Sequence, residues 1–236
     1  MLKTLTVAIV EEPKISAKML CEYSESSALT RKNILKSCKE KDSAAMAASI
    51  RYTQAQNAIS DFLEHSFDFT DALRYYAKNI RIESKNLSGK KAEYAVSCAE
   101  AIDKFCEMEK QIKSLFKDFI INNTIKLKWE RISISGVDIS IRPEVMLYTD
   151  SGITPSGFVK LCFCKSKPMK ETVAKSIAAL GRFYFREKKD IDFKPVNCIV
   201  IDVFAKKIYS GNKSEKRLID ILKECCAEIA DRWDKI

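Results

Sequence analysis

The sequence predicts an α+β protein, with a helical N-terminal region over residues 1–90 and an α/β core with a mixed central sheet over residues 91–236. Three patterns predict this organisation. In the first half, apolar residues recur at helical spacing between short polar breaks. In the second half, two runs that alternate apolar and polar residues flank Ser135-Gly136, which is the pattern of a β-hairpin with a two-residue turn. The nearly continuous apolar run CIVIDVF is typical of a strand covered on both faces.

Helical patterns occupy most of the first half. Ser16 is a residue type that favours the capping position of a helix, and the stretch Asn86-Leu87-Ser88-Gly89 is the clearest break. Residues 3–10 fit a short strand or an apolar arm. We expect helices over residues 16–23, 28–41, 44–64 (capped by Asp42-Ser43) and 67–84, and one long helix over residues 91–120.

The second half alternates between strand and helix patterns. The predicted hairpin joins residues 125–134 to 137–147, and a third strand follows over residues 158–165. The apolar phase changes within the first strand, which predicts a β-bulge near Glu130-Arg131. Pro143 cannot donate to a sheet, so the second strand is expected to bend or lose a partner there. A helix over residues 168–188, strands over 197–204 and 208–210, and a helix from Ser214 to Trp233 complete the chain.

Composition restricts the classes of protein. A chain of 236 residues that is 46% hydrophobic can bury a full core. No apolar run approaches 18 residues, and the N-terminal LTVAIV is too short for the apolar core of a signal peptide, so we expect a cytoplasmic protein without a membrane span.

Cysteine and histidine usage excludes several chemistries. The nine cysteines are scattered and lack the knuckle spacing of a zinc site, so reduced and mostly buried thiols are expected, rather than disulfides or an iron-sulfur cluster. His65 is the only histidine, which leaves no partner for a zinc hydrolase or a Ser-His triad. Any catalysis would therefore use carboxylates, lysine and a hard metal ion.

The net charge of +9 lies mostly in the second half. Residues 1–115 hold 18 basic and 16 acidic residues, whereas residues 116–236 hold 23 and 16. A basic group made by Lys165, Lys167, Lys170 and Arg182 follows the third strand and fits a nucleic-acid backbone. The alternative is a solvated lysine-rich surface without a ligand.

The strand alternation places two charged residues on one surface. Side chains along a strand alternate between faces, so Glu144 of the second strand and Lys160 of the third can meet if these strands are neighbours. A carboxylate beside a strand irregularity and a lysine is how many metal-dependent phosphodiesterases present their first ligand.

The order of elements and these residues together resemble the core of the PD-(D/E)XK, or restriction-endonuclease-like, nuclease superfamily, over roughly residues 92–236. In that superfamily an acidic residue after proline on the second strand, and an acid-x-lysine on the third, bind Mg²⁺ and activate water. Pro143-Glu144 would supply the first half here and Phe158-Val159-Lys160 the second. Phe158 departs from the pattern, because the family carries a carboxylate there. The chain also resembles uncharacterised bacterial proteins, and that resemblance implies no activity.

The resemblance implies roles for individual residues. Glu144 would hold Mg²⁺, Glu171 or Glu130 would be the second ligand, and Lys160 would polarise the attacking water or steady the phosphate. Each second acid has an ordinary alternative: Glu171 can complement the helix N-terminus, and Glu130 can lie on a distorted edge strand. Glu107 and Glu109 are accessory candidates or solvated helix residues. Asp202, inside an apolar run, is expected to pair with a lysine or arginine, or to contribute to a metal site.

Two functions follow, with a third kept open. The first is a nucleic-acid-processing protein, a Mg²⁺-dependent nuclease. The second is the same scaffold without catalysis, acting as a nucleic-acid-binding or protein-binding subunit in a mobile-element or defence system, because a single carboxylate holds Mg²⁺ weakly. The third is a helical interaction protein whose basic surface meets an acidic partner. The expected partners are a nucleic acid and a protein partner or second copy.

Overall fold

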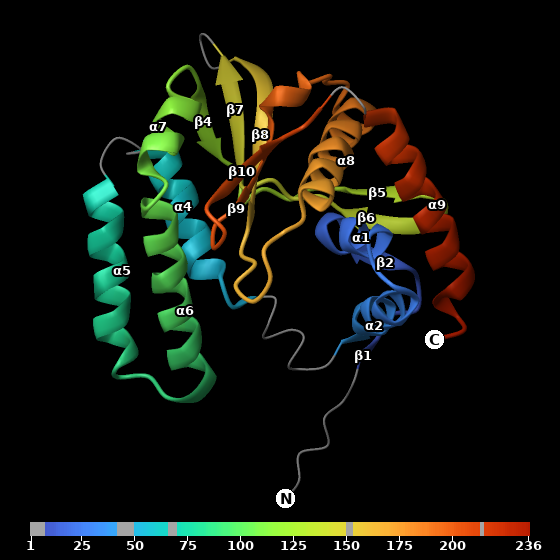
Figure 1. The fold of residues 1–236 in the computed structure, drawn as a ribbon, viewed down its shortest axis with the longest axis horizontal. Helices are drawn as coiled ribbons and strands as arrows, with labels where there is room; N and C mark the ends of the chain where they lie inside the picture. The colour runs from blue at the N-terminus through green and yellow to red at the C-terminus, as the bar shows by residue number, and fades with distance from the viewer. Residues whose placement is uncertain (1–7, 42–49, 66–69, 150–152, 213–214) are drawn as a thin grey trace, which may run out of the picture.

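The computed structural model describes residues 8–41, 50–65, 70–149, 153–212 and 215–236. These residues form an α+β fold, as the sequence predicts. A five-stranded mixed sheet stands at the centre with helices on both of its faces (Figure 1).

The N-terminal part is mainly helical. Its first elements are β1 (Ala8–Ile9), β2 (Lys14–Ser16), α1 (Ala17–Ser24), α2 (Ala28–Lys39) and β3 (Glu40–Lys41). The next are α4 (Thr53–His65), α5 (Thr70–Ser84), α6 (Gly89–Cys106) and α7 (Glu109–Phe116). Ser16 caps α1 as predicted, since its side chain accepts a hydrogen bond of 3.3 Å from the backbone N–H of Met19.

The second part supplies most of the strands. They are β4 (Ile120–Asn123), β5 (Arg131–Ile134), β6 (Val137–Ser140), β7 (Val145–Thr149), β8 (Thr154–Cys162), β9 (Cys198–Asp202) and β10 (Lys207–Ser210). The helices α8 (Glu171–Lys189) and α9 (Glu215–Trp233) and a 3₁₀ turn, η1 (Pro195–Asn197), lie among them.

The large sheet has the strand order β10-β9-β8-β7-β4. Strand β7 runs antiparallel to both β4 and β8, and β8 runs parallel to β9. A parallel pair needs a crossover connection, and α8 supplies it. The five strands therefore form one continuous mixed sheet.

The predicted hairpin is present but belongs to another sheet. Strands β5 and β6 pair around Ser135-Gly136, whose φ angles of 48° and 80° are those of a turn with two left-handed positions. Strand β2 joins β6 in parallel, which gives a three-stranded sheet in the order β2-β6-β5. Residues 141–144, around Pro143, are not in a strand, so the chain leaves the small sheet and enters the large one at the predicted irregularity.

Two hydrophobic clusters cover the two faces of the large sheet. One joins α1, α8, α9 and the small sheet to Phe158 and Cys162 of β8. The other joins α4, α5, α6 and α7 to Val159 and Leu161, the alternating residues of the same strand. Each cluster contains residues from both sides of position 90. The division into regions 1–90 and 91–236 stays a prediction.

Three predictions differ from the structure. The single helix over residues 91–120 is wrong: α6 ends at Cys106, the buried Met108 starts a new turn, and Ile120–Asn123 pair with β7 as β4. The first strand is shorter than predicted, because residues 124–130 are a loop. The bulge near Glu130 is wrong as well, since β5 and β6 pair without a shift of register. The predicted cap residues Asp42-Ser43 and Ser214 lie outside the described residues.

Among the described residues, no helix has the length and apolar character needed to cross a bilayer.

Candidate functional site

Glu144 is a buried carboxylate at the entrance to β7. Its backbone N–H donates to the carbonyl of Val159 at 3.0 Å, and its carbonyl accepts from the N–H of Thr124 at 2.9 Å. Only 1% of the residue is exposed. The preceding Pro143 interrupts the strand ladder, so Glu144 stands where β7 begins and its side chain is directed between the strands and α4.

Three donors surround the Glu144 carboxylate. Oε1 accepts from Nε2 of Gln56 at 2.5 Å and from the ammonium of Lys160, and Oε2 accepts from the backbone N–H of Leu161 at 2.5 Å. Lys160 also donates to the carbonyl of Arg142 at 2.8 Å, and its side chain is 21% exposed. The meeting of Glu144 and Lys160 predicted from strand alternation is present as an ion pair. The buried negative charge is thereby compensated and hydrogen-bonded.

The thiol beside this pair is protonated. Cys162 follows Lys160 on the same face of β8, and its burial raises its pKa to about 12, against the opposing influence of Lys160 and Lys18. A thiol with this pKa carries almost no thiolate at neutral pH. Cys162 therefore fits a packing role and not that of a nucleophile.

Phe158 lies at the position where the resemblance leads us to expect a second carboxylate. It lies one alternation before Lys160, and its ring is directed into the core beneath α8. It stacks on Phe185 at 5.7 Å between ring centroids and contacts Phe193 at 6.2 Å. An ideal Cβ built on Gly181 would lie 2.3 Å from Cζ of Phe158, so α8 approaches β8 closely here.

Two of the other predicted acidic residues, Glu171 and Glu107, form ion pairs with lysines away from Glu144. Glu171 lies exposed in the first turn of α8, where a hydrogen bond from Lys175 lowers its pKa. Glu107 is held by Lys104 and Lys206, and these hydrogen bonds lower its pKa to about 2.

Glu109 and Glu130 likewise show no contact with Glu144. Glu109 pairs with Lys113 at 2.9 Å. Glu130 is an exposed residue of the loop before β5. The structure therefore brings Glu144 and Lys160 together and adds none of the four accessory acids to them.

The residues around Glu144 do not fit a magnesium ion. Magnesium prefers six oxygen ligands, and protein sites supply carboxylates that are free to bind it. Both oxygens of Glu144 are occupied by donors, one of them a cation that would repel the metal. No three side chains of the acid, histidine or cysteine type are grouped to hold a metal anywhere in the described ranges.

Asp202 does not have the lysine or arginine partner that the sequence predicts. It lies at the end of β9 with no exposed surface, but its partners are backbone groups and not a lysine or arginine. Oδ2 accepts from the N–H of Met169 at 2.8 Å, and Oδ1 accepts from the N–H of Ala205 at 3.3 Å. Asp202 thus ties the loop before α8 to the turn after β9, a structural role that backbone amides fulfil without a cation.

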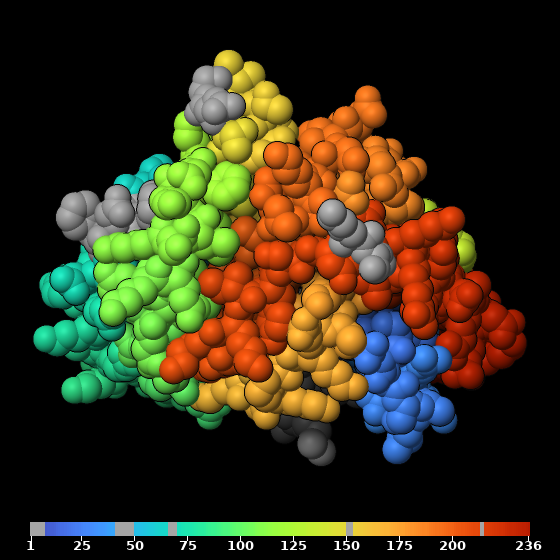
Figure 2. All heavy atoms as spheres, turned by 45° about the horizontal axis from the view of Figure 1, so that its top comes forward, coloured from blue at the N-terminus to red at the C-terminus, as the bar shows by residue number. Residues whose placement is uncertain are grey.

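The predicted basic residues divide into two groups. Lys165, Lys167 and Lys170 are exposed on the loop between β8 and α8, and this loop lies between α1 and the segment around residue 205 in the space-filling view (Figure 2). Lys165 pairs with Glu100, and Lys170 lies 3.8 Å from Glu25.

Arg182 differs from these lysines. Its side chain is 17% exposed and contacts Glu215, Asp192 at 2.6 Å and the carbonyl of Phe193. Glu215 also contacts Arg186 at 3.4 Å. Because its donors are used within the fold, Arg182 joins α8 to α9 instead of facing a ligand.

Gln56 is the site residue that sequence reasoning missed. It lies on α4 beside the buried Ala55 and Ile59, and it reaches Glu144 across 88 positions of the chain. A single glutamine on an amphipathic helix carries no signal of its partner, so no local pattern identifies it.

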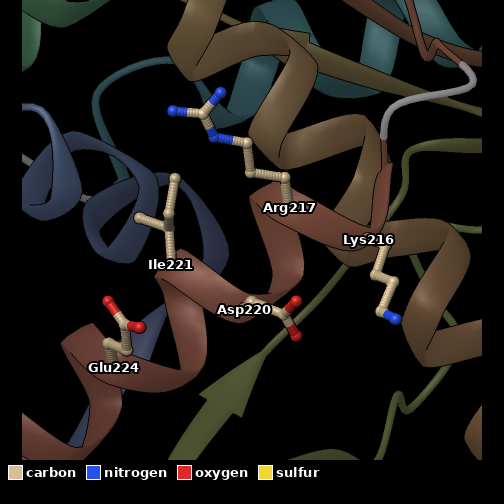
Figure 3. Close-up of a pocket in the computed structure, with 5 residues that line it drawn as sticks. All are labelled: Lys216, Arg217, Asp220, Ile221 and Glu224. Atoms are coloured by element: carbon tan, nitrogen blue, oxygen red, sulfur yellow. The ribbon is translucent and has the colours of Figure 1, made fainter.

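A shallow hollow on α9 is separate from these residues. Lys216, Arg217, Asp220, Ile221 and Glu224 line it, and they all project from the outer side of the one helix (Figure 3). Its charges are mixed in sign, and it holds no residue of the Glu144 site.

A comparison with models of known protein families finds no match for this chain, and a comparison with curated protein sequences finds none either.

Proposed function

We propose that this chain is a nucleic-acid-binding protein built on a nuclease-like scaffold, and that it does not cleave its ligand through a metal ion. The arrangement of Glu144 carries this proposal. Its carboxylate is closed by Lys160, Gln56 and the N–H of Leu161, and Phe158 stands where a second carboxylate would be needed. A metal-dependent phosphodiesterase requires open oxygen ligands at this point.

The scaffold part of the proposal rests on the order of elements. Helix α7, the antiparallel strands β4, β7 and β8, the crossover helix α8 and the parallel strand β9 occur in this order, with the β5–β6 hairpin of the small sheet between β4 and β7. Pro143-Glu144 come immediately before the second strand of this set, and Lys160 lies on the third. This order supports a likeness to the PD-(D/E)XK core, and the loss of its second acid supports an inactive form.

The binding part rests on charge. The chain carries a net +9, and the loop between β8 and α8 holds the exposed residues Lys165, Lys167 and Lys170, of which Lys165 and Lys170 also lie near Glu100 and Glu25. Phosphate contacts of this kind release counterions and give affinity without reading the bases. All nine cysteines are free thiols, which supports a cytoplasmic location, where thiols stay reduced.

The test measures binding and cleavage together. The purified protein is incubated with labelled single-stranded and double-stranded DNA and RNA in Mg²⁺ or Mn²⁺, beside the variants Glu144→Gln and Lys167→Glu/Lys170→Glu. We expect salt-sensitive binding without cleavage, unchanged by Glu144→Gln. The double lysine variant should lose about tenfold or more in affinity, with a shallower salt dependence, because phosphate contacts are lost.

Lys110→Glu is the matched control, because Lys110 is an exposed lysine of α7. It should bind as the unmodified protein does. If the unmodified protein cleaves a nucleic acid and Glu144→Gln abolishes this cleavage, the proposal that the scaffold does not cleave its ligand is wrong. Absence of binding to every nucleic acid would overturn the proposal as a whole.

A further inference from the structure

The two parallel strands of the large sheet end side by side, and an aromatic residue follows each of them. Strand β8 ends at Cys162, before Phe163, and β9 ends at its register partner Asp202, two residues before Phe204. Both ends lie at the edge of the sheet where α4 begins (Figure 1). In α/β sheets, ligands commonly bind outside the carboxyl ends of the parallel strands.

A third ring, that of Tyr52 just before α4, joins the other two. It stacks on Phe163, with 5.1 Å between ring centroids and 12° between ring planes, and it meets Phe204 edge-on at 5.6 Å. All three residues pack against the cluster of α4 to α7, and all three are only half-buried. The aromatic group of Tyr52, Phe163 and Phe204 therefore keeps accessible surface at this edge of the sheet.

Arg51 places a positive charge next to the aromatic group. Its guanidinium lies 5.2 Å from the centroid of the Tyr94 ring, as a cation–π contact. Burial raises the pKa of Tyr52, and Arg51 and Lys165 oppose this rise, so both cations lie near that ring. The Nε of Arg51 has no hydrogen-bond partner, and no carboxylate among the described residues forms an ion pair with this side chain. Its charge is therefore available to an anion such as a phosphate.

Acidic residues beside the aromatic group are outnumbered by basic ones. Lys165 pairs with Glu100, whereas Glu107 pairs with two lysines, Lys104 at 2.7 Å and Lys206 at 2.8 Å. Five basic and three acidic residues lie here, which leaves an excess of two positive charges; they are Arg51, Lys104, Lys165, Lys167 and Lys206, and Glu100, Glu107 and the buried Asp202.

The neighbouring flanks do not reverse this sign. Their charged residues form pairs of opposite sign on the sides of α1 and α5, and a single exposed acid stands beside two exposed lysines near the start of α6. The pairs are Lys18–Glu22, Lys170–Glu25 and Arg81–Asp103, and the last set is Glu93 with Lys90 and Lys91.

We propose that this surface binds single-stranded nucleic acid, with unpaired bases stacked on the aromatic group and the backbone phosphates held by Arg51 and the lysines of the loop after β8. Aromatic side chains offer a face to a base of any identity, and cations beside them hold the phosphates. The inference rests on the proposed function and names the form of nucleic acid that this chain takes.

The aromatic group favours a single strand over a duplex. In a duplex the faces of the bases cover one another, and only their edges and the phosphates are accessible. A duplex could contact Lys165 and Lys167, but it would gain nothing from the three rings. The rings therefore distinguish the two forms, which phosphate contacts alone do not.

The test compares three labelled oligonucleotides of equal length with the full chain. They are a single strand, the duplex of that strand, and an abasic strand that keeps the phosphates and lacks the bases. Fluorescence anisotropy gives the three affinities at several salt concentrations. We expect the single strand to bind at least about fivefold more tightly than the duplex or the abasic strand, because base stacking adds to the phosphate contacts.

Ring variants test the aromatic group. Tyr52→Leu and Phe163→Leu keep an apolar side chain and remove the ring, so each should weaken the single strand by about fivefold or more and leave the abasic strand unchanged. Tyr52→Phe keeps the ring and should bind as the unmodified protein does. Tyr75→Leu, at a 65% exposed tyrosine of α5, is the matched control and should change nothing. Circular dichroism establishes that each variant is folded.

Two further variants test the charges. Arg51→Gln should weaken the single strand and the abasic strand alike, with a shallower salt dependence, because a phosphate contact is lost. Glu100→Gln should tighten the binding of both strands, because it releases Lys165 from its ion pair.

A photochemical crosslink locates the bases without any variant. A single strand that contains 5-iodouracil is irradiated with the unmodified full chain, and mass spectrometry identifies the residue to which it is joined. We expect attachment to Tyr52, Phe163 or Phe204.

Three results would overturn the inference and leave the proposed function standing. They are a duplex or an abasic strand that binds as tightly as the single strand, folded ring variants with unchanged affinity for the single strand, and crosslinks confined to residues outside the aromatic group. If the ring variants do not fold, the crosslink decides. Absence of binding to every nucleic acid would overturn both the inference and the proposed function.

Discussion

At the scale of single residues, Glu144 shows how the fold supplies partners to a buried carboxylate. Water has been removed from it, and Lys160, Gln56 and a backbone amide take the place of water. Removal of one partner of such a pair costs far more than the pair contributes as a whole, because the remaining charge stays buried without compensation.

We expect Lys160→Met to destabilise the protein by about 3 kcal/mol, because Glu144 loses its cation. Glu144→Gln/Lys160→Met should recover at least half of that loss, since the buried charge is gone. Urea unfolding at neutral pH gives the free energy of unfolding of both variants, from the midpoint and slope of the transition.

Lys165→Met serves as the control, since its pair with Glu100 is exposed and should contribute less than about 1 kcal/mol. An equal loss in the single and double variants would mean that the lysine stem, and not the charge, stabilises the site.

The same residues show what sequence can predict. The pair of Glu144 and Lys160 followed from strand alternation, which depends only on neighbouring positions. Gln56 and the backbone partners of Asp202 did not follow, because both arise from segments that meet only in the folded chain. Glu171 and Glu107 were candidates because of the resemblance and their places on the helices next to the strands, whereas Lys175 pairs with the first and Lys206 with the second.

At the scale of elements, the contact between β8 and α8 is unusually close at one point. Gly181 lies in the interior of α8, where alanine would normally favour the helix by about 1 kcal/mol. An added Cβ there would meet the ring of Phe158, which is packed by Phe185 and Phe193 and has little room to move. Packing against Phe158 therefore favours glycine at position 181, although helix propensity favours alanine.

We expect Gly181→Ala to destabilise the protein by about 1–3 kcal/mol, the usual cost of overpacking a core. Combined with Phe158→Leu, the alanine should cost less than it does alone, because the ring that it meets is gone. Thermal unfolding of the two single variants and the double variant gives the coupling. A stabilised Gly181→Ala protein would show that α8 can shift away from the sheet at no cost.

Elements with strong local signals were predicted well. The Ser135-Gly136 turn, the buried β9 and the irregularity at Pro143 each have a distinct chemistry that acts over a few residues. Strand β4 was missed because Ile120–Asn123 continue an amphipathic run, and only pairing with β7 makes them a strand. The assignment of the hairpin to a separate sheet was also beyond local pattern, since β2 joins it from far along the chain.

At the scale of the whole molecule, the large sheet belongs to both hydrophobic clusters. Alternate residues of β8 and β9 enter one cluster and then the other, so neither cluster can be lost without exposing a face of the sheet. The N-terminal helices α1 and α4 pack on opposite clusters. This arrangement favours a single cooperative unit over two independent regions.

We expect one unfolding transition for the full chain. Trp129 and Trp233 both contact the cluster that contains α8, whereas far-ultraviolet circular dichroism also reports the helices α4 to α7 of the other cluster. Fluorescence and circular dichroism should therefore give the same midpoint in urea. Two separated midpoints would instead support a boundary near residue 90.

The segment around Pro143 connects the small sheet to the large sheet. Residues 125–143 leave the large sheet after Thr124 and return at Glu144, and the two ends are tied by hydrogen bonds of 2.9 Å from Thr124 to the carbonyls of Glu144 and Pro143. Lys160 donates a hydrogen bond to the carbonyl of Arg142 in the same segment. Lys160 thus contacts both the segment that leads from the small sheet and the buried carboxylate, so a displacement of the hairpin would change the surroundings of Glu144.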